Sequence, residues 1–267
     1  MTHLTFTPLL ASGALQFAFD KATLEGKFVI FALITLSLFS WTVIITKLRQ
    51  LYIARKWAKR FLAAYESTRD PLDIRKKGES FEGAPVYQLY LRGADELDYQ
   101  LTHNPKLVNG ERRISTGSFE AVKVTLEEAA STQALVLEKG MIVLSTAVSG
   151  GPFIGLLGTV WGVMDTFAGV ALANAASLTA MAPGVAGALI TTVIGLLVAI
   201  PAMFAYNYMV TTLRAITKEL DGFASRFAIQ IEHAYVEKRN LEEKIADAIL
   251  RADHQAHQVS AIVGANI

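Results

Sequence analysis

Residues 141–213 restrict the possible folds of this chain more than any other segment. The segment runs for 73 residues and contains one charged side chain, Asp165. The apolar core of a bilayer is about 30 Å thick, and about 20 apolar residues in a helix cross it. We therefore expect two membrane-spanning helices, within residues 140–172 and 181–213, joined by a short polar turn at residues 173–180.

A third apolar segment occupies residues 28–46, between Lys27 and Lys47, and contains no charged side chain. Its 19 residues are enough for one more crossing. The mean hydropathy of the whole chain is +0.36, which is typical of a membrane protein with a sizeable soluble part. The sequence thus predicts an integral membrane protein with three transmembrane helices.

Charge predicts how these helices are oriented. Residues 47–60 contain six lysines and arginines and no acid, whereas the bases and acids of residues 1–27 balance. Basic residues accumulate on the cytoplasmic side of a membrane, so residues 1–27 are expected outside and residues 47–139 in the cytoplasm. Three crossings then place the tail, residues 214–267, in the cytoplasm as well.

Outside the bilayer the apolar residues recur at helical spacing, and no strand pattern stands out. The expected elements are a helix continuing the first crossing over residues 47–68, a short helix at 86–101, a loop at 103–117, a helix from Phe119 running unbroken into the second crossing, and a helical tail from Arg214 to about Ala252. Residues 8–26 fit a short amphipathic helix or a loosely ordered terminus equally well. The predicted fold is all-α, with long helices that extend into the cytoplasm.

Small residues recur at four-residue spacing in the second and third crossings. They include Gly155, Gly158 and Gly162 in the second crossing and Gly195 in the third. In lipid no hydrophobic force holds helices together, so such seams mark close helix contacts. Because three helices offer few partners within one chain, much of the seam is expected to meet other subunits, which favours a homo-oligomer.

Thr159, Thr191 and Thr192 are expected near the middle of the membrane. A threonine hydroxyl in a helix can simply bond to a backbone carbonyl of its own helix. Alternatively, hydroxyls on neighbouring helices can line a narrow path for protons or Na⁺, because each hydroxyl both donates and accepts hydrogen bonds.

Asp165 lies six residues beyond Thr159, which is about 9 Å further outward along a helix. An ionisable group at this depth is costly and suggests a function. It is interpreted as a carboxylate reaching interfacial water, as an ion entrance, or as the partner of a basic residue on another chain.

Several classes of protein are not expected. The chain has no cysteine, which excludes disulfides and thiolate sites, and a net charge of +1 does not favour nucleic acid binding. His254 and His257 lack a further metal ligand at suitable spacing, and the sequence contains no zinc-protease, phosphate-loop or nucleophile-elbow motif. An enzyme is therefore not expected, nor is any cofactor.

The second and third crossings read GPFIGLLGTVWGVMDTF and APGVAGALITTVIGLLVAIPAMFAYN. These segments resemble the ExbB/TolQ branch of the MotA/TolQ/ExbB proton channel family, most densely from about Glu120 to Asn207. The resemblance implies a homopentameric ring in the bacterial inner membrane, with a periplasmic N-terminus. The ring would enclose single-span ExbD- or TolR-like subunits, with H⁺ as the coupling ion, and would act on a TonB- or TolA-like protein.

On this resemblance Thr159 and Thr192 match threonines that line the ion path, and Pro183, Pro201 and the glycines shape the helices. Two positions depart from the family pattern. Gly187 stands where the family commonly has a glutamate, and Asp165 stands where a histidine is frequent.

The sequence leaves other functions open. The alternatives are a stator subunit of a flagellar or gliding motor and a membrane scaffold that conducts no ion. A small secondary transporter is less well supported, because no inverted repeat is present. The residues do not distinguish import across the outer membrane from envelope maintenance, nor H⁺ from Na⁺.

Overall fold

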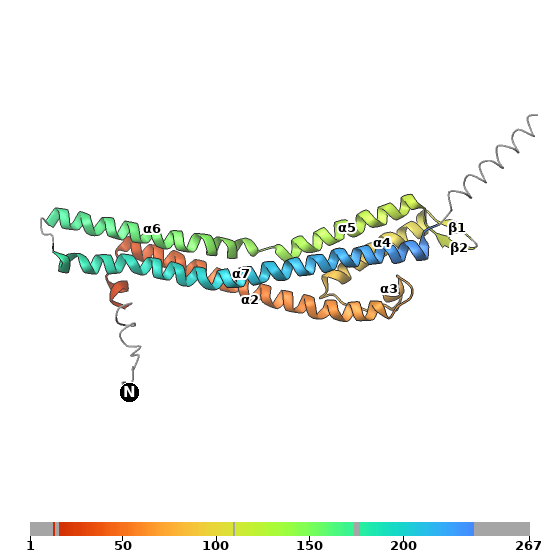
Figure 1. Ribbon diagram of the computed structural model, residues 1–267, viewed down its shortest axis with the longest axis horizontal. Coiled ribbons are helices and arrows are strands. Elements are labelled where there is room, and N and C mark those ends of the chain that lie inside the picture. Colours follow the sequence, from red (N-terminus) through yellow and green to blue (C-terminus); the bar gives the residue numbers. More distant parts are fainter. Residues whose placement is uncertain (1–12, 14–15, 109, 174–176, 238–267) are drawn as a thin grey trace, which may run out of the picture.

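The computed structural model describes residues 13, 16–108, 110–173 and 177–237. Three long helices pack against one another: α2 (Leu24–Glu66), α6 (Met141–Ala173) and α7 (Leu178–Tyr235), with α6 confined to one half of the molecule (Figure 1). Each is long and apolar enough to cross a membrane. The prediction of an all-α membrane protein with three spanning helices is confirmed.

Two of these helices are much longer than a bilayer core is thick. The 43 residues of α2 and the 58 residues of α7 correspond to about 65 Å and about 87 Å, against a membrane core of about 30 Å. Beyond their apolar segments they pack with the shorter helices α4 (Pro85–His103) and α5 (Thr116–Glu138) (Figure 1). The short helix α3 (Asp73–Lys77) joins the same core through Ile74. The helices expected at residues 47–68 and 86–101 are confirmed.

An aromatic core holds this second part of the molecule together. Phe61 of α2, Tyr90 of α4, and Phe223 and Phe227 of α7 are all fully buried. The ring of Phe61 lies 5.5 Å from those of Tyr90 and Phe223, and Tyr90 lies 5.2 Å from Phe227. Such aromatic pairs contribute about 0.5–1.5 kcal/mol each beyond their buried area. The long extensions of α2 and α7 are therefore tied to one another well away from the apolar segments.

The prediction that one helix runs from Phe119 into the second crossing is wrong. The helix α5 ends at Glu138 and α6 begins at Met141. Gly140 between them has a φ of +89°, a left-handed conformation that ends helices and that glycine adopts without strain. The apolar helix α6 and the helix α5 that precedes it are thus two separate elements.

The prediction of a loop at residues 103–117 without strands is also wrong. Strands β1 (Lys106–Val108) and β2 (Glu111–Arg113) form an antiparallel hairpin, with Lys106 opposite Arg113. The sequence signal was the Asn-Gly pair at residues 109–110, which favours tight hairpin turns. Ile114, just past β2, pairs with Val236 at the end of α7 and so anchors the hairpin to the bundle.

The remaining boundaries differ by a few residues from those expected. The helix α6 continues to Ala173 and α7 begins at Leu178, so the connection is shorter than the turn predicted at residues 173–180. Within the segment 8–26, residues 16–20 are helical. Residues 8–12 and 14–15 of that segment, and the tail beyond residue 237, lie outside the described residues.

Candidate functional site

The seam of small residues joins α6 to α7 within one chain. A Cβ atom at Gly155 would lie 2.8 Å from the carbonyl oxygen of Thr191, and one at Gly162 would lie 2.8 Å from the Cβ of Ala188. Gly158 faces Thr191, and Gly195 faces Gly151, with equally close approaches. The expectation that much of this seam meets other subunits is wrong, because the antiparallel neighbour α7 already fills it.

This close approach brings three threonine hydroxyls together. The Oγ1 of Thr159 on α6 is hydrogen-bonded to the hydroxyls of Thr191, at 3.2 Å, and of Thr192, both on α7. Thr191 Oγ1 also donates across the seam to the carbonyl oxygen of Gly155 at 2.9 Å. These three side chains, here called the hydroxyl cluster, are residues that the sequence analysis singled out for an ion path.

The hydroxyl cluster has more acceptors than hydrogens. The carbonyl oxygens of Gly155 and Ala188 are each within hydrogen-bonding distance of both Thr159 Oγ1 and Thr191 Oγ1. Each hydroxyl has one hydrogen and can donate it in only one direction at a time. The hydroxyls can therefore exchange partners by rotation, which is what a proton relay requires. The same contacts include hydrogen bonds from Thr159 and Thr191 to carbonyl oxygens of their own helices, which is the plainer interpretation.

Burial of the hydroxyl cluster is unequal. The side chain of Thr191 is completely buried, whereas Thr159 and Thr192 are half-buried. The cluster is thus closed at Thr191 and open at one edge of the α6–α7 pair. A group from a neighbouring chain, or water, can reach it at that edge.

The prolines and Asp165 lie apart from the hydroxyl cluster. Pro183 and Pro201 are inside α7, and Pro152 is inside α6, without ending either helix. Asp165 is exposed and, within the described part of the chain, has no hydrogen bond or ion pair. The structure therefore does not bring Asp165 into contact with the threonines. It leaves the carboxylate free for an external partner or water.

The sequence analysis missed a buried cation beside the helix break. Lys47, just after the first apolar segment, is only 8% exposed. Its Nζ donates to the carbonyl oxygen of Leu137 at 2.9 Å and to Gln50 Oε1 at 2.9 Å. It thereby satisfies one of the carbonyls left free where α5 ends. Its position after an apolar run was informative about orientation but not about this contact.

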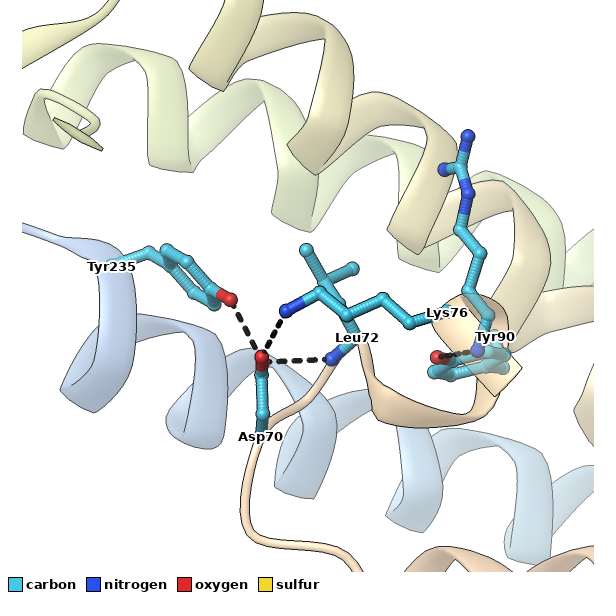
Figure 2. Close-up of polar contacts among 6 residues, drawn as sticks. Asp70, Leu72, Lys76, Tyr90 and Tyr235 are labelled. Carbon is cyan, nitrogen blue, oxygen red and sulfur yellow. Dashed lines mark hydrogen bonds and ion pairs between the residues drawn. The ribbon is translucent and has the colours of Figure 1, made fainter. Parts of the chain in front are cut away.

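A second polar centre surrounds Asp70, in the loop after α2 (Figure 2). Asp70 Oδ1 accepts from the backbone N–H of Leu72 at 3.0 Å and from the hydroxyl of Tyr235 at 2.7 Å, and Oδ2 accepts from Lys76. Partial burial raises the pKa of Asp70, but these hydrogen bonds and the Lys76 charge outweigh it and hold the pKa below its usual value. Asp70 therefore joins the end of α7 to the loop after α2.

The nearby Tyr90 keeps its phenolic proton at neutral pH. Its hydroxyl accepts from the backbone N–H of Arg75 at 3.1 Å, and burial is the main cause that raises its pKa to about 12. Across the described residues, no group of three or more histidine, aspartate or glutamate side chains is placed to hold a metal ion. We therefore interpret Asp70 as a structural clamp between the end of α7 and the loop after α2.

The sequence of this chain is similar to those of known proteins. A sequence model of the MotA/TolQ/ExbB proton channel family matches residues 100–222, which contain the hydroxyl cluster. The chain is 33% identical over 214 residues to the Tol-Pal system protein TolQ of Haemophilus influenzae, covering 78% of this chain and 90% of that protein.

Other relatives give the same result. TolQ of Pseudomonas aeruginosa is 32% identical over 70% of this chain and 79% of its own length. The biopolymer transport protein ExbB of Pseudomonas putida is 30% identical over 71% of this chain and 54% of its own length. Both branches, TolQ and ExbB, are thus similar to this chain to nearly the same degree.

Proposed function

This chain belongs to the MotA/TolQ/ExbB proton channel family, and on that premise we propose that it forms the ion path of an inner-membrane energy transducer. The hydroxyl cluster of Thr159, Thr191 and Thr192 is the observation that carries the proposal. H⁺ is the proposed coupling ion, because hydroxyls that exchange hydrogen-bond partners suit a proton better than a fixed ion shell. The chain itself makes or breaks no covalent bond in this function.

The energetics suit such a transducer. Moving one charge through a potential of 100 mV releases about 2.3 kcal/mol. An ion that binds two conformations with different affinity shifts the balance between them. A few protons per step therefore suffice to drive a mechanical change in a partner protein.

The proposed assembly is a ring, a pentamer in this family, in the bacterial inner membrane with the N-terminus in the periplasm. Large apolar side chains remain exposed on α6 and α7 and need lipid or protein partners: Phe153, Leu157, Met164, Leu197 and Phe204. An ExbD- or TolR-like single-span subunit would meet the open edge of the hydroxyl cluster. A TonB- or TolA-like protein would receive the motion, for outer-membrane import or envelope maintenance.

The test is the double variant Thr159→Ala and Thr192→Ala. We expect it to assemble normally but to lose function that depends on the proton motive force, because the open edge of the cluster then has no hydroxyl. Thr35→Ala with Thr42→Ala is the matched control, since both hydroxyls bond only to their own helix, α2, at 2.9 and 2.8 Å. Growth that depends on the energised system, and native mass of the purified complex, are the readouts.

Normal energised function in the Thr159→Ala, Thr192→Ala variant would contradict the ion path. The hydroxyls would then serve helix packing alone, and a non-conducting scaffold would be the better interpretation. Loss of function in the control variant as well would have the same consequence, since it would show no special role for the cluster.

A further inference from the structure

Just before α2 begins, the backbone of Lys21 and Ala22 crosses α7 at Gly187. A Cβ atom at Gly187 would lie 2.7 Å from the carbonyl carbon and oxygen of Lys21 and 2.8 Å from the backbone nitrogen of Ala22. Contacts this short to backbone atoms do not occur in folded proteins, and backbone cannot rotate away as a side chain can. Only glycine at position 187 allows the crossing.

The crossing is supported on both sides by packing and hydrogen bonds. Ala18 and Ala22 form a buried apolar cluster with Ile30 of α2 and Ile190 of α7. Thr23 caps α2, its Oγ1 accepting from the backbone N–H of Gly26 at 3.2 Å. Residues 16–26, here called the N-terminal strap, are therefore fitted to α7 and continuous with the first turn of α2.

The end of the N-terminal strap lies beside Thr191, the buried member of the hydroxyl cluster. A Cβ at Gly26 would lie 3.8 Å from the Cγ2 methyl of Thr191, which is ordinary van der Waals contact. Gly187 and Thr191 are one helical turn apart on α7, on the same face. The strap thus covers the face of α7 that carries Thr191, while Thr159 and Thr192 stay half-buried at the other edge.

We propose that the N-terminal strap is a seal, which closes one side of the hydroxyl cluster and leaves the Thr159–Thr192 edge open. The sealing role depends on the function proposed above, whereas the seating of the strap at Gly187 does not. A path that couples proton flow to work must be closed to water along its sides, because protons would otherwise leak past it without doing work. A side chain at position 187 would lift the strap and open the cluster.

Seating is measured first, by thiol labelling of the full complex in lipid nanodiscs. The chain has no cysteine, so Ala22→Cys introduces a single reporter at a position that is 7% exposed. Adding Gly187→Ala should raise its maleimide labelling rate by roughly tenfold or more, because a buried thiol reacts only when its surroundings open. Gly169→Ala is the matched control, since nothing lies within 4 Å of a Cβ at Gly169.

A milder variant covers the case in which Gly187→Ala does not assemble. Thr23→Ala removes only the cap at Gly26 and should raise labelling of the Ala22→Cys reporter by a smaller factor. Phe19→Cys, at a position that is 45% exposed, should label quickly in every background. Unchanged labelling of the Ala22→Cys reporter in both variants would overturn the seating of the strap.

Sealing is measured next, as passive proton leak into liposomes that contain the complex. Gly187→Ala should increase the leak several-fold, and adding Thr159→Ala with Thr192→Ala should abolish the increase. Increased labelling without increased leak would overturn the seal while leaving the seating intact. An increased leak that persists without the two threonines would also overturn the seal, because it would show that water bypasses the hydroxyl cluster. The Thr159→Ala, Thr192→Ala variant with Gly187 intact tests the proposed function separately.

Discussion

At the residue scale, the absence of side chains on one face of α6 sets how close the two central helices come. Gly155, Gly158 and Gly162 bring the backbone of α6 against Thr191 and Ala188 of α7. This short separation is what allows Thr159 to reach hydroxyls that are 32 and 33 residues away in the sequence. The glycines are therefore a condition for the hydroxyl cluster rather than a separate feature.

Gly155→Ala should destabilise the α6–α7 pair. The added Cβ would lie 2.8 Å from the carbonyl oxygen of Thr191 and 3.0 Å from the Cα of Thr192, both backbone atoms. Overpacking of this kind costs about 1–3 kcal/mol. Thermal unfolding of the purified protein in detergent should show a lower midpoint, while Gly169→Ala, in open space, should leave it unchanged or slightly higher. Equal midpoints for the two variants would contradict the close packing.

At the element scale, a break between α5 and α6 distinguishes this pair of helices from the continuous helices α2 and α7. The helices α2 and α7 continue from the apolar segments into the second part of the bundle, whereas α5 and α6 are separated at Gly140 (Figure 1). Lys47 of α2 bonds to the carbonyl oxygen of Leu137 at this break. A neighbouring continuous helix thus holds the end of an interrupted one.

Lys47→Met should loosen the junction of α5 and α6. The carbonyl of Leu137 would lose its donor, and an unsatisfied buried polar group costs about 1–3 kcal/mol. Hydrogen–deuterium exchange of the amides around residues 136–143 should become faster. The exposed neighbour Arg49, replaced in Arg49→Met, provides the control and should not change exchange there. Unaltered exchange in Lys47→Met would show that the contact does not hold the break.

At the scale of the whole molecule, the two ends of the bundle have different chemistry. One end carries the apolar helices and the hydroxyl cluster. The other end is held by aromatic packing and by the hydrogen bonds of Asp70, which Figure 2 shows. The hydroxyl of Tyr235, the last residue of α7, bonds to Asp70 in the loop after α2. The two long continuous helices are therefore clamped at the end distant from the proposed ion path.

The clamp should give a defined pH dependence. The pKa of Asp70 is lower in the folded protein than its ordinary value of 3.8, so the charged form favours folding. Its contribution is complete above the ordinary pKa and is lost as the pH falls through the lower, folded value. Asp70→Asn should lower the midpoint of thermal unfolding at pH 7, and the difference from the parent protein should shrink below about pH 4.

The control for the clamp is Asp221→Asn, on the exposed surface of α7. It removes the same charge without breaking the contact between α7 and the loop after α2, so its effect at pH 7 should be small. A difference between Asp70→Asn and the parent that stays constant down to pH 3 would contradict the assignment, because it would not follow titration of the carboxyl.

The sequence by itself determined the number of crossings, the all-α class and the family. These follow from long uncharged segments, because a bilayer accepts little else, and from a dense local motif around Thr159. The three threonines could also be singled out, since their distance from the ends of the apolar segments places them near the middle of the membrane. Charge predicts the orientation, which stays a prediction.

Tertiary structure alone decided which of these residues meet. The register of α6 against α7 brings Thr159 to Thr191 and Thr192 but leaves Asp165 exposed, and helical periodicity does not set the register between two helices. Spacing marked the glycines as contacts without saying that the partner is the same chain. The contacts of Lys47 with Leu137 and of Gly187 with Lys21 join residues far apart in sequence, where no local pattern records them.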